Sequence, residues 1–158
     1  MNAKEANAII DDLYDQKQND YYIDFVPITF PNEDFAELAD YLENHYKPDF
    51  ANKIVFIAFT IMHYYESYVF LDNTAEEPIY PDLVNKDLRH MGLDELSKLI
   101  HKIIIENWSG LYIIFKNENQ ISTMRISDEY DTSFRNLSGN ALALVKQLVR
   151  QQGIYLKN

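Results

Sequence analysis

The residues of this chain that could do chemistry are few, and the first set pairs an imidazole with a carboxylate. His63 and Glu66 enclose two tyrosines in the run His63-Tyr64-Tyr65-Glu66, and on a helix a spacing of three brings both side chains onto one face. Such a pair can supply two metal ligands, but the other three histidines lack a close HxxE or HxxxH companion. We therefore expect no metal here. If these residues do form a site, the sequence favours a ligand pocket lined by His63, Tyr64, Glu66 and Tyr68, which we keep as an alternative to partner binding.

A second set of oxygens comes from three aspartates near the beginning of the chain. Asp11, Asp12 and Asp15 carry enough carboxylate oxygens for a divalent cation. A calcium loop of the EF-hand type needs a glycine turn and alternating ligands, whereas these carboxylates lie in a stretch with helical periodicity. We expect no metal and no cofactor, and we interpret the three acids as surface residues.

The sequence contains no motif for a catalytic nucleophile or for nucleotide binding. Ser109 precedes Gly110, but no G-x-S-x-G sequence surrounds it. Four glycines leave no phosphate-binding loop, and the absence of cysteine excludes thiol nucleophiles and disulfides. The block from Arg125 to Asp131 leaves a predicted hairpin and carries three acids, which we interpret as a capped turn, with a binding loop as the alternative. These observations favour a protein that is not an enzyme.

Charge is the most uneven property of the chain. The net charge is -11, and residues 1–80 hold 16 acidic and 4 basic residues, whereas residues 81–158 hold 9 and 10. A surface of this sign attracts cationic partners and repels nucleic acid and anionic membranes. We therefore expect no nucleic-acid partner and no membrane partner.

The elements that must position these residues follow from hydrophobic spacing. A helical stripe runs from Ala6 to Tyr14, with the three aspartates outside it. The stretch Tyr21–Phe30 predicts a strand that Pro27 restricts to a sheet edge, and Pro31 then opens a second helix. On that second helix the acids Glu33, Glu37 and Asp40 are expected on the outer face.

The stretch from Asp49 to Ser67 allows two interpretations, a central helix or paired strands. Its polar residues gather into one arc of a helical wheel, whereas a strand would scatter them over both faces, so we predict the helix. Phe56 and Phe59 fall inside that polar arc. Either another element covers them, or they belong to an interface between copies of the chain.

The second half of the chain predicts further helices and a hairpin. Two runs of β-branched and aromatic residues, Leu111–Lys116 and Ile121–Ile126, flank a polar turn and predict a β-hairpin. The other predicted elements are a strand over Tyr68–Leu71, a short helix over Asp82–His90, helices over Leu93–Asn107 and Gly139–Gln152, and a strand over Ile154–Leu156 beside the hairpin. We predict an α+β fold, a helix-dominated single domain of residues 1–158 with a small antiparallel sheet built on the C-terminal hairpin and a soft boundary at residues 72–80.

The function that the sequence favours is the binding of a basic protein partner, as in an inhibitor-type or immunity-type bacterial protein. Acids and tyrosines on the first two helices would form the partner surface, and this set consists of Asp11, Asp12, Asp15, Glu33, Glu37, Asp40 and Tyr41. Two alternatives remain, namely a small enzyme or ligand-binding domain around His63 and Glu66, and a homo-oligomeric structural domain. The oligomeric state is open, and the lack of cysteine, of a signal sequence and of a membrane-length segment favours the cytoplasm.

Overall fold

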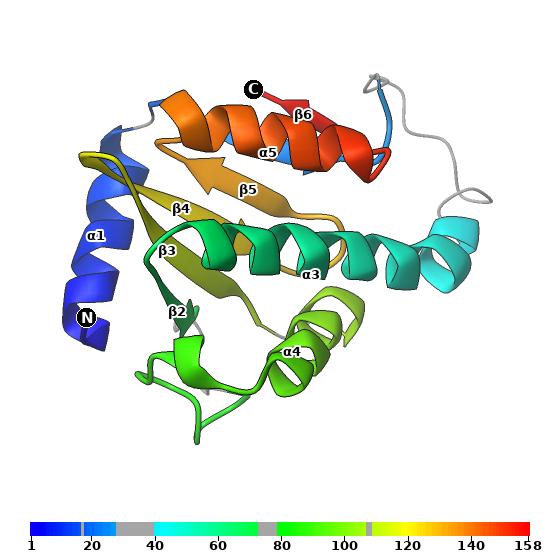
Figure 1. The fold of residues 1–158 in the computed structure, drawn as a ribbon. Coiled ribbons are helices and arrows are strands. Elements are labelled where there is room, and N and C mark those ends of the chain that lie inside the picture. The colour runs from blue at the N-terminus through cyan, green and yellow to red at the C-terminus, as the bar shows by residue number, and fades with distance from the viewer. Residues whose placement is uncertain (17, 28–39, 73–78, 107–108) are drawn as a thin grey trace.

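The structure is a computed structural model, and it describes residues 1–16, 18–27, 40–72, 79–106 and 109–158. Its centre is a six-stranded antiparallel sheet with the strand order β2-β3-β4-β5-β1-β6 (Figure 1). The helices are α1 (Ala3–Gln16), the π-helix η1 (Leu42–Tyr46), α3 (Lys47–Tyr64), the 3₁₀-helix η2 (Leu88–His90), α4 (Leu93–Glu106) and α5 (Gly139–Gln151). The strands are β1 (Tyr21–Asp24), β2 (Ser67–Leu71), β3 (Leu111–Asn117), β4 (Gln120–Ile126), β5 (Thr132–Arg135) and β6 (Tyr155–Lys157). The predicted α+β class is confirmed.

One face of the sheet packs against α3, α4 and α5 and forms the main core (Figure 1). In α3 the residues Phe50, Ile54, Ile57 and Ile61 recur at helical spacing and are fully buried. Pro48 lies in the first turn of this helix, where its missing N–H costs no hydrogen bond. The helical interpretation of this stretch is therefore confirmed, and the paired-strand alternative is wrong.

The opposite face of the sheet is covered in part by α1. Ala6 is fully buried and forms a small second core with Phe70 of β2 and Ile114 of β3. A reciprocal cap begins the helix, since the Asn2 side chain accepts from the Glu5 backbone N–H (3.0 Å) while the Glu5 carboxylate accepts from that of Asn2 (2.9 Å). Strand residues alternate between faces, so the face of Phe70 and Ile114 is distinct from that of the main core.

The hairpin is confirmed, but the sheet is larger than the hairpin. β1 lies between β5 and β6 and is not an edge strand. It ends at Asp24, before Pro27, so the proline removes no ladder hydrogen bond. β6 pairs with β1 and not with the hairpin, and β5 is a strand that the sequence did not predict.

Of two further predicted helices, one is wrong and the other lies outside the described residues. In place of a helix over Asp82–His90, the structure has turns followed by the 3₁₀-helix η2. The Asp87 carboxylate caps η2 by accepting from Arg89 N (3.0 Å), and it also accepts from Val69 N (3.0 Å) of the edge strand β2. The helix predicted after Pro31 falls on residues 31–39, which lie outside the described residues.

Candidate functional site

The register of the sheet brings polar residues together at one end of it. Leu71, Leu111, Ile126, Thr132 and Ile23 form one row across five strands, and they belong to or line the main core. The neighbours of this row in the sequence face the α1 side, because side chains alternate along a strand. They are Asp72, Tyr112, Arg125 and Asp24, which share this end of the sheet with Asp131.

Arg125 organises the centre of this end of the sheet. Its guanidinium contacts the Asp131 carboxylate through Nη1 (2.7 Å) and the Asp72 carboxylate through Nη2 (3.4 Å). The Asp72 side chain is 8% exposed, that of Arg125 24% and that of Asp131 54%. The Nε of Arg125 is buried and has no hydrogen-bond partner among the described residues. One arginine therefore holds two carboxylates of different burial in fixed positions.

Gly110 permits the close packing of Asp72. The Asp72 backbone N–H donates to the Gly110 carbonyl (2.8 Å). A Cβ at position 110 would lie 2.9 Å from the Asp72 Cβ and 3.1 Å from its Oδ2. Only glycine leaves room for this carboxylate beneath Arg125 without displacement.

A first hollow of about 470 Å³ opens between α1 and the sheet. Asn7, Ile10, Asp11 and Tyr14 of α1 line one side, and Leu71, Asp72, Tyr112 and Arg125 line the other. The Tyr112 hydroxyl donates to that of Tyr14 (3.4 Å). Burial, with this hydrogen bond, raises the pKa of the Tyr112 phenol, so the phenol is neutral at physiological pH.

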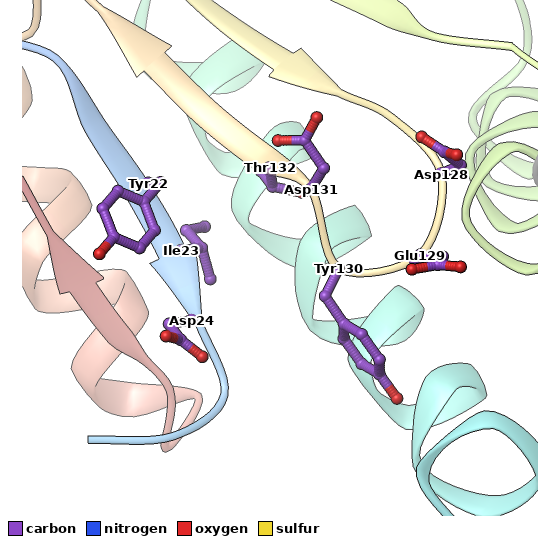
Figure 2. Close-up of a pocket in the computed structure, with 8 residues that line it drawn as sticks. All are labelled: Tyr22, Ile23, Asp24, Asp128, Glu129, Tyr130, Asp131 and Thr132. Atoms are coloured by element: carbon purple, nitrogen blue, oxygen red, sulfur yellow. The ribbon is translucent and has the colours of Figure 1, made fainter. Parts of the chain in front are cut away.

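A second hollow of about 390 Å³ lies between β1 and the loop that joins β4 to β5. Figure 2 shows Asp24 at the end of β1 and Asp128, Glu129 and Asp131 on the loop, and all four line the hollow. The Lys157 ammonium contacts the Asp24 carboxylate (2.6 Å). Glu129 has a positive φ of 55°. Its backbone N–H donates to the carbonyl of Ile104 in α4 (3.1 Å), which fixes the loop against that helix.

Tyr130 anchors the same loop by packing towards α3. In Figure 2 its ring points away from the acids, towards α3, where the Phe50 ring centroid lies 5.0 Å away and that of Phe25 lies 4.5 Å away. The Tyr130 hydroxyl donates to the Leu42 carbonyl (3.0 Å) of η1. Burial, with the negative charge of Glu43 as a smaller cause, raises the pKa of Tyr130 to about 12.

Both hollows are lined by more negatively charged than positively charged side chains. We call the six carboxylates that line them the acidic rim, and its members are Asp11, Asp24, Asp72, Asp128, Glu129 and Asp131. Against these six, Arg125 is the single cation lining either hollow in the described part of the chain. Because Arg125 contacts Asp72 in the first hollow and Asp131 at the second, the two hollows adjoin each other. Such a surface suits a ligand with positive charge.

The residues predicted to bind a partner lie in two places. Asp11, Asp12 and Asp15 are exposed on α1 as expected, but only Asp11 lines a hollow. Asp40 and Tyr41 are exposed next to η1, on the opposite side of the molecule from α1 (Figure 1). The structure does not bring these two groups together, and Glu33 and Glu37 lie outside the described residues. Whether any of them contacts a partner stays a prediction.

The alternative pocket around His63 is not a single pocket. His63 lines a shallow groove on α3, whereas Glu66 and Tyr68 line a separate hollow beside β3 and β4. Glu66 follows the end of α3, so the helical spacing of three does not apply to it, and its carboxylate accepts from the Tyr68 hydroxyl (3.0 Å). Tyr64 is 66% exposed. Over the ranges that the structure covers, no three His, Asp or Glu side chains are placed to share a metal ion.

Only part of the acidic rim is predictable from the sequence. The block Arg125–Asp131 was identified as a mixed-charge loop, and in place of backbone capping by Asp128 and Asp131 the structure shows Asp131 paired with Arg125 and Asp128 accepting from the Ser127 hydroxyl (2.8 Å). Asp24 and Asp72 carried no motif. The signal that could have found them is their position as the last residue of a strand and the residue directly after one.

Comparisons with known proteins give no information about function. No family model matches it, and neither the curated proteins nor the solved structures contain a match. No helix in the described ranges has the length and apolar character needed to cross a lipid bilayer. Function must therefore be argued from the site itself.

Proposed function

We propose that this protein binds a basic protein partner through the acidic rim and performs no catalysis itself. The observation that carries the proposal is the excess of six carboxylates over two cations, Arg125 and the Lys157 that contacts Asp24, around two adjoining hollows. A cationic partner is drawn to such a surface at long range, and its lysine or arginine side chains can enter the two hollows.

The rim is ordered before any partner arrives. Arg125 fixes Asp72 and Asp131, Lys157 contacts Asp24, and the loop is held by Tyr130 and the backbone of Glu129. Preorganised groups lose little conformational freedom on binding, which improves affinity for a given set of contacts. This rigidity supports a stable, stoichiometric complex, as an inhibitor or immunity-type protein requires.

Aromatic rings accompany the carboxylates. Tyr22 lines the second hollow and is 43% exposed, and Tyr14 lines the first and is 38% exposed. Tyrosine combines a large contact area with a hydroxyl and is enriched among the residues that dominate binding energy. The charges would set the rate of encounter, and these rings would supply much of the affinity.

The test compares two double variants with the same change in net charge. Asp128→Lys/Glu129→Lys reverses two exposed rim charges, and Asp12→Lys/Asp15→Lys reverses two exposed charges of α1 that line neither hollow. The probe is a fluorescent oligolysine peptide, and its binding is followed by anisotropy over a series of salt concentrations.

We expect the rim variant to bind the peptide roughly tenfold more weakly, because an exposed ion pair contributes about 0.2–1 kcal/mol and each reversal replaces attraction with repulsion. The α1 variant should bind like the parent protein, and the parent's affinity should fall steeply with salt. Equal weakening of both variants would show that only net charge matters and would refute the rim as the binding surface.

A further inference from the structure

The outer face of α3 carries an uncharged groove that the proposed function does not use. Its lining is formed by Asn52, Val55, Phe56, Phe59, Thr60 and His63, and its volume is about 400 Å³. Phe56 is 48% exposed, although most large apolar residues of α3 are fully buried. Figure 1 shows α3 between α5 and α4 in the helical layer, so this face of α3 points away from the sheet.

Two polar groups at the groove are already paired within the chain. The Thr60 hydroxyl donates to the Phe56 carbonyl (2.7 Å) of its own helix, which leaves the Thr60 methyl group as an apolar neighbour of the rings. Lys53, beside the groove, contacts the Asp49 carboxylate (2.9 Å). The lining contains no Asp, Glu, Lys or Arg. A highly charged partner therefore finds no complementary charge in this lining, whereas a second copy of this chain sets no lining carboxylate against another.

The order of the lining residues matches that of a second, antiparallel copy of the same helix. A two-fold axis at the level of Ile57 and Ala58 places Phe56 opposite the Phe59 of a second molecule, and the reverse contact follows by symmetry. The same axis sets Val55 against Thr60 and Asn52 against His63. Each lining residue then meets another lining residue, with rings at the centre and hydrogen-bonding groups at both ends.

We propose that this groove is the interface of a two-fold symmetric homodimer formed by antiparallel packing of α3 against α3. The lining residues Asn52, Phe56, Phe59 and His63 follow the alternating spacing of four and three that antiparallel helix pairs use. The lining consists of six residues of one helix, whereas stable complexes use roughly 20–30 residues per partner, so a weak dimer is expected. It leaves the acidic rim free, and the proposal is independent of the proposed function.

The chain contains no cysteine, which allows a direct test of the register. Asn52→Cys and His63→Cys are prepared as two separate single variants and are oxidised alone and as a mixture. The antiparallel register places position 52 beside position 63 of the other copy, within disulfide reach. It separates position 52 from its own counterpart by roughly 16 Å, given a helical rise of about 1.5 Å per residue.

The expected result is a cross-linked dimer from the mixture and little from either variant alone. Equal cross-linking of Asn52→Cys with itself, or no cross-linking in any tube, overturns the proposal. Sedimentation equilibrium at about 100 μM provides the second arm: the parent chain should be dimeric in part, Phe56→Lys monomeric, and Leu93→Lys, at an exposed position of α4 outside the groove, like the parent. A purely monomeric parent chain, or a Phe56→Lys variant that dimerises like the parent, also overturns it.

Discussion

The two carboxylates that contact Arg125 should differ in their effect on stability, and the order should be the reverse of that suggested by distance. Asp131 lies 2.7 Å from the guanidinium and Asp72 lies 3.4 Å from it. The perturbation is Asp72→Asn and, separately, Asp131→Asn, because asparagine keeps the shape of aspartate and removes only the charge. A ranking by distance makes Asp131→Asn the more damaging change.

Burial predicts the opposite ranking. Asp131 is 54% exposed, so water and salt screen its attraction to Arg125, and pairs of this kind contribute about 0.2–1 kcal/mol. Asp72 is 8% exposed. Removing one partner of a fully buried pair costs about 3–5 kcal/mol, and the partial exposure of Arg125 lowers this figure. We expect Asp72→Asn to reduce the free energy of unfolding by about 2 kcal/mol and Asp131→Asn by about 0.5 kcal/mol.

The assay is urea denaturation at pH 7, with the free energy of unfolding extrapolated to water for the parent chain and both variants. Repeating the series in 0.5 M NaCl should remove most of the effect of Asp131→Asn, and it should leave most of that of Asp72→Asn, because salt screens exposed pairs more strongly. If Asp131→Asn proves as costly as Asp72→Asn, the reasoning from burial is wrong.

Two further changes test how the acidic rim is held in place. Gly110→Ala should lower the free energy of unfolding by about 1–3 kcal/mol in the same urea assay, because its Cβ would stand 2.9 Å from that of Asp72 and must displace it; unchanged stability would contradict this packing. Tyr130→Phe should cost about 1 kcal/mol at pH 8 through the lost hydrogen bond to Leu42. The folded state keeps the Tyr130 proton up to a pKa of about 12 whereas the unfolded chain releases it near pH 10, so this tyrosine's contribution is present below pH 10 and is lost as the pH rises towards 12. Urea denaturation at pH 8, 10 and 11 should therefore show a shallower alkaline loss of stability for Tyr130→Phe than for the parent, and an unchanged slope would contradict the burial of this phenol.

Local patterns in the sequence predicted those elements whose stability depends on near neighbours. The hairpin was predictable because two runs of β-branched and aromatic residues flank the polar residues 117–120, and α3 because its polar residues share one arc. β5 was missed because only Phe134 and Leu137 stand out as apolar between Tyr130 and Gly139. Its ladder is completed by β1, more than a hundred residues away in the sequence. Pairing over such a distance leaves no local signal.

The candidate site was predictable only in part for the same reason. Exposure of Asp11 followed from the helical stripe of α1, and the loop before Asp131 followed from its composition. The placement of Asp24, Asp72 and Arg125 at one end of the sheet depends on the register of five strands at once. No single segment contains that information, so the acidic rim became visible only in the folded chain.

The most direct test of the acidic rim as a partner surface is a map of amide chemical shifts. A ¹⁵N-labelled sample is titrated with the unlabelled oligolysine peptide, and the shift changes are plotted on the structure. The account predicts changes concentrated at Asp24, Asp72 and residues 128–132, with weak changes at Asp12 and Asp15. Changes of equal size at Asp12 and Asp15, or spread over all exposed acids, would contradict it.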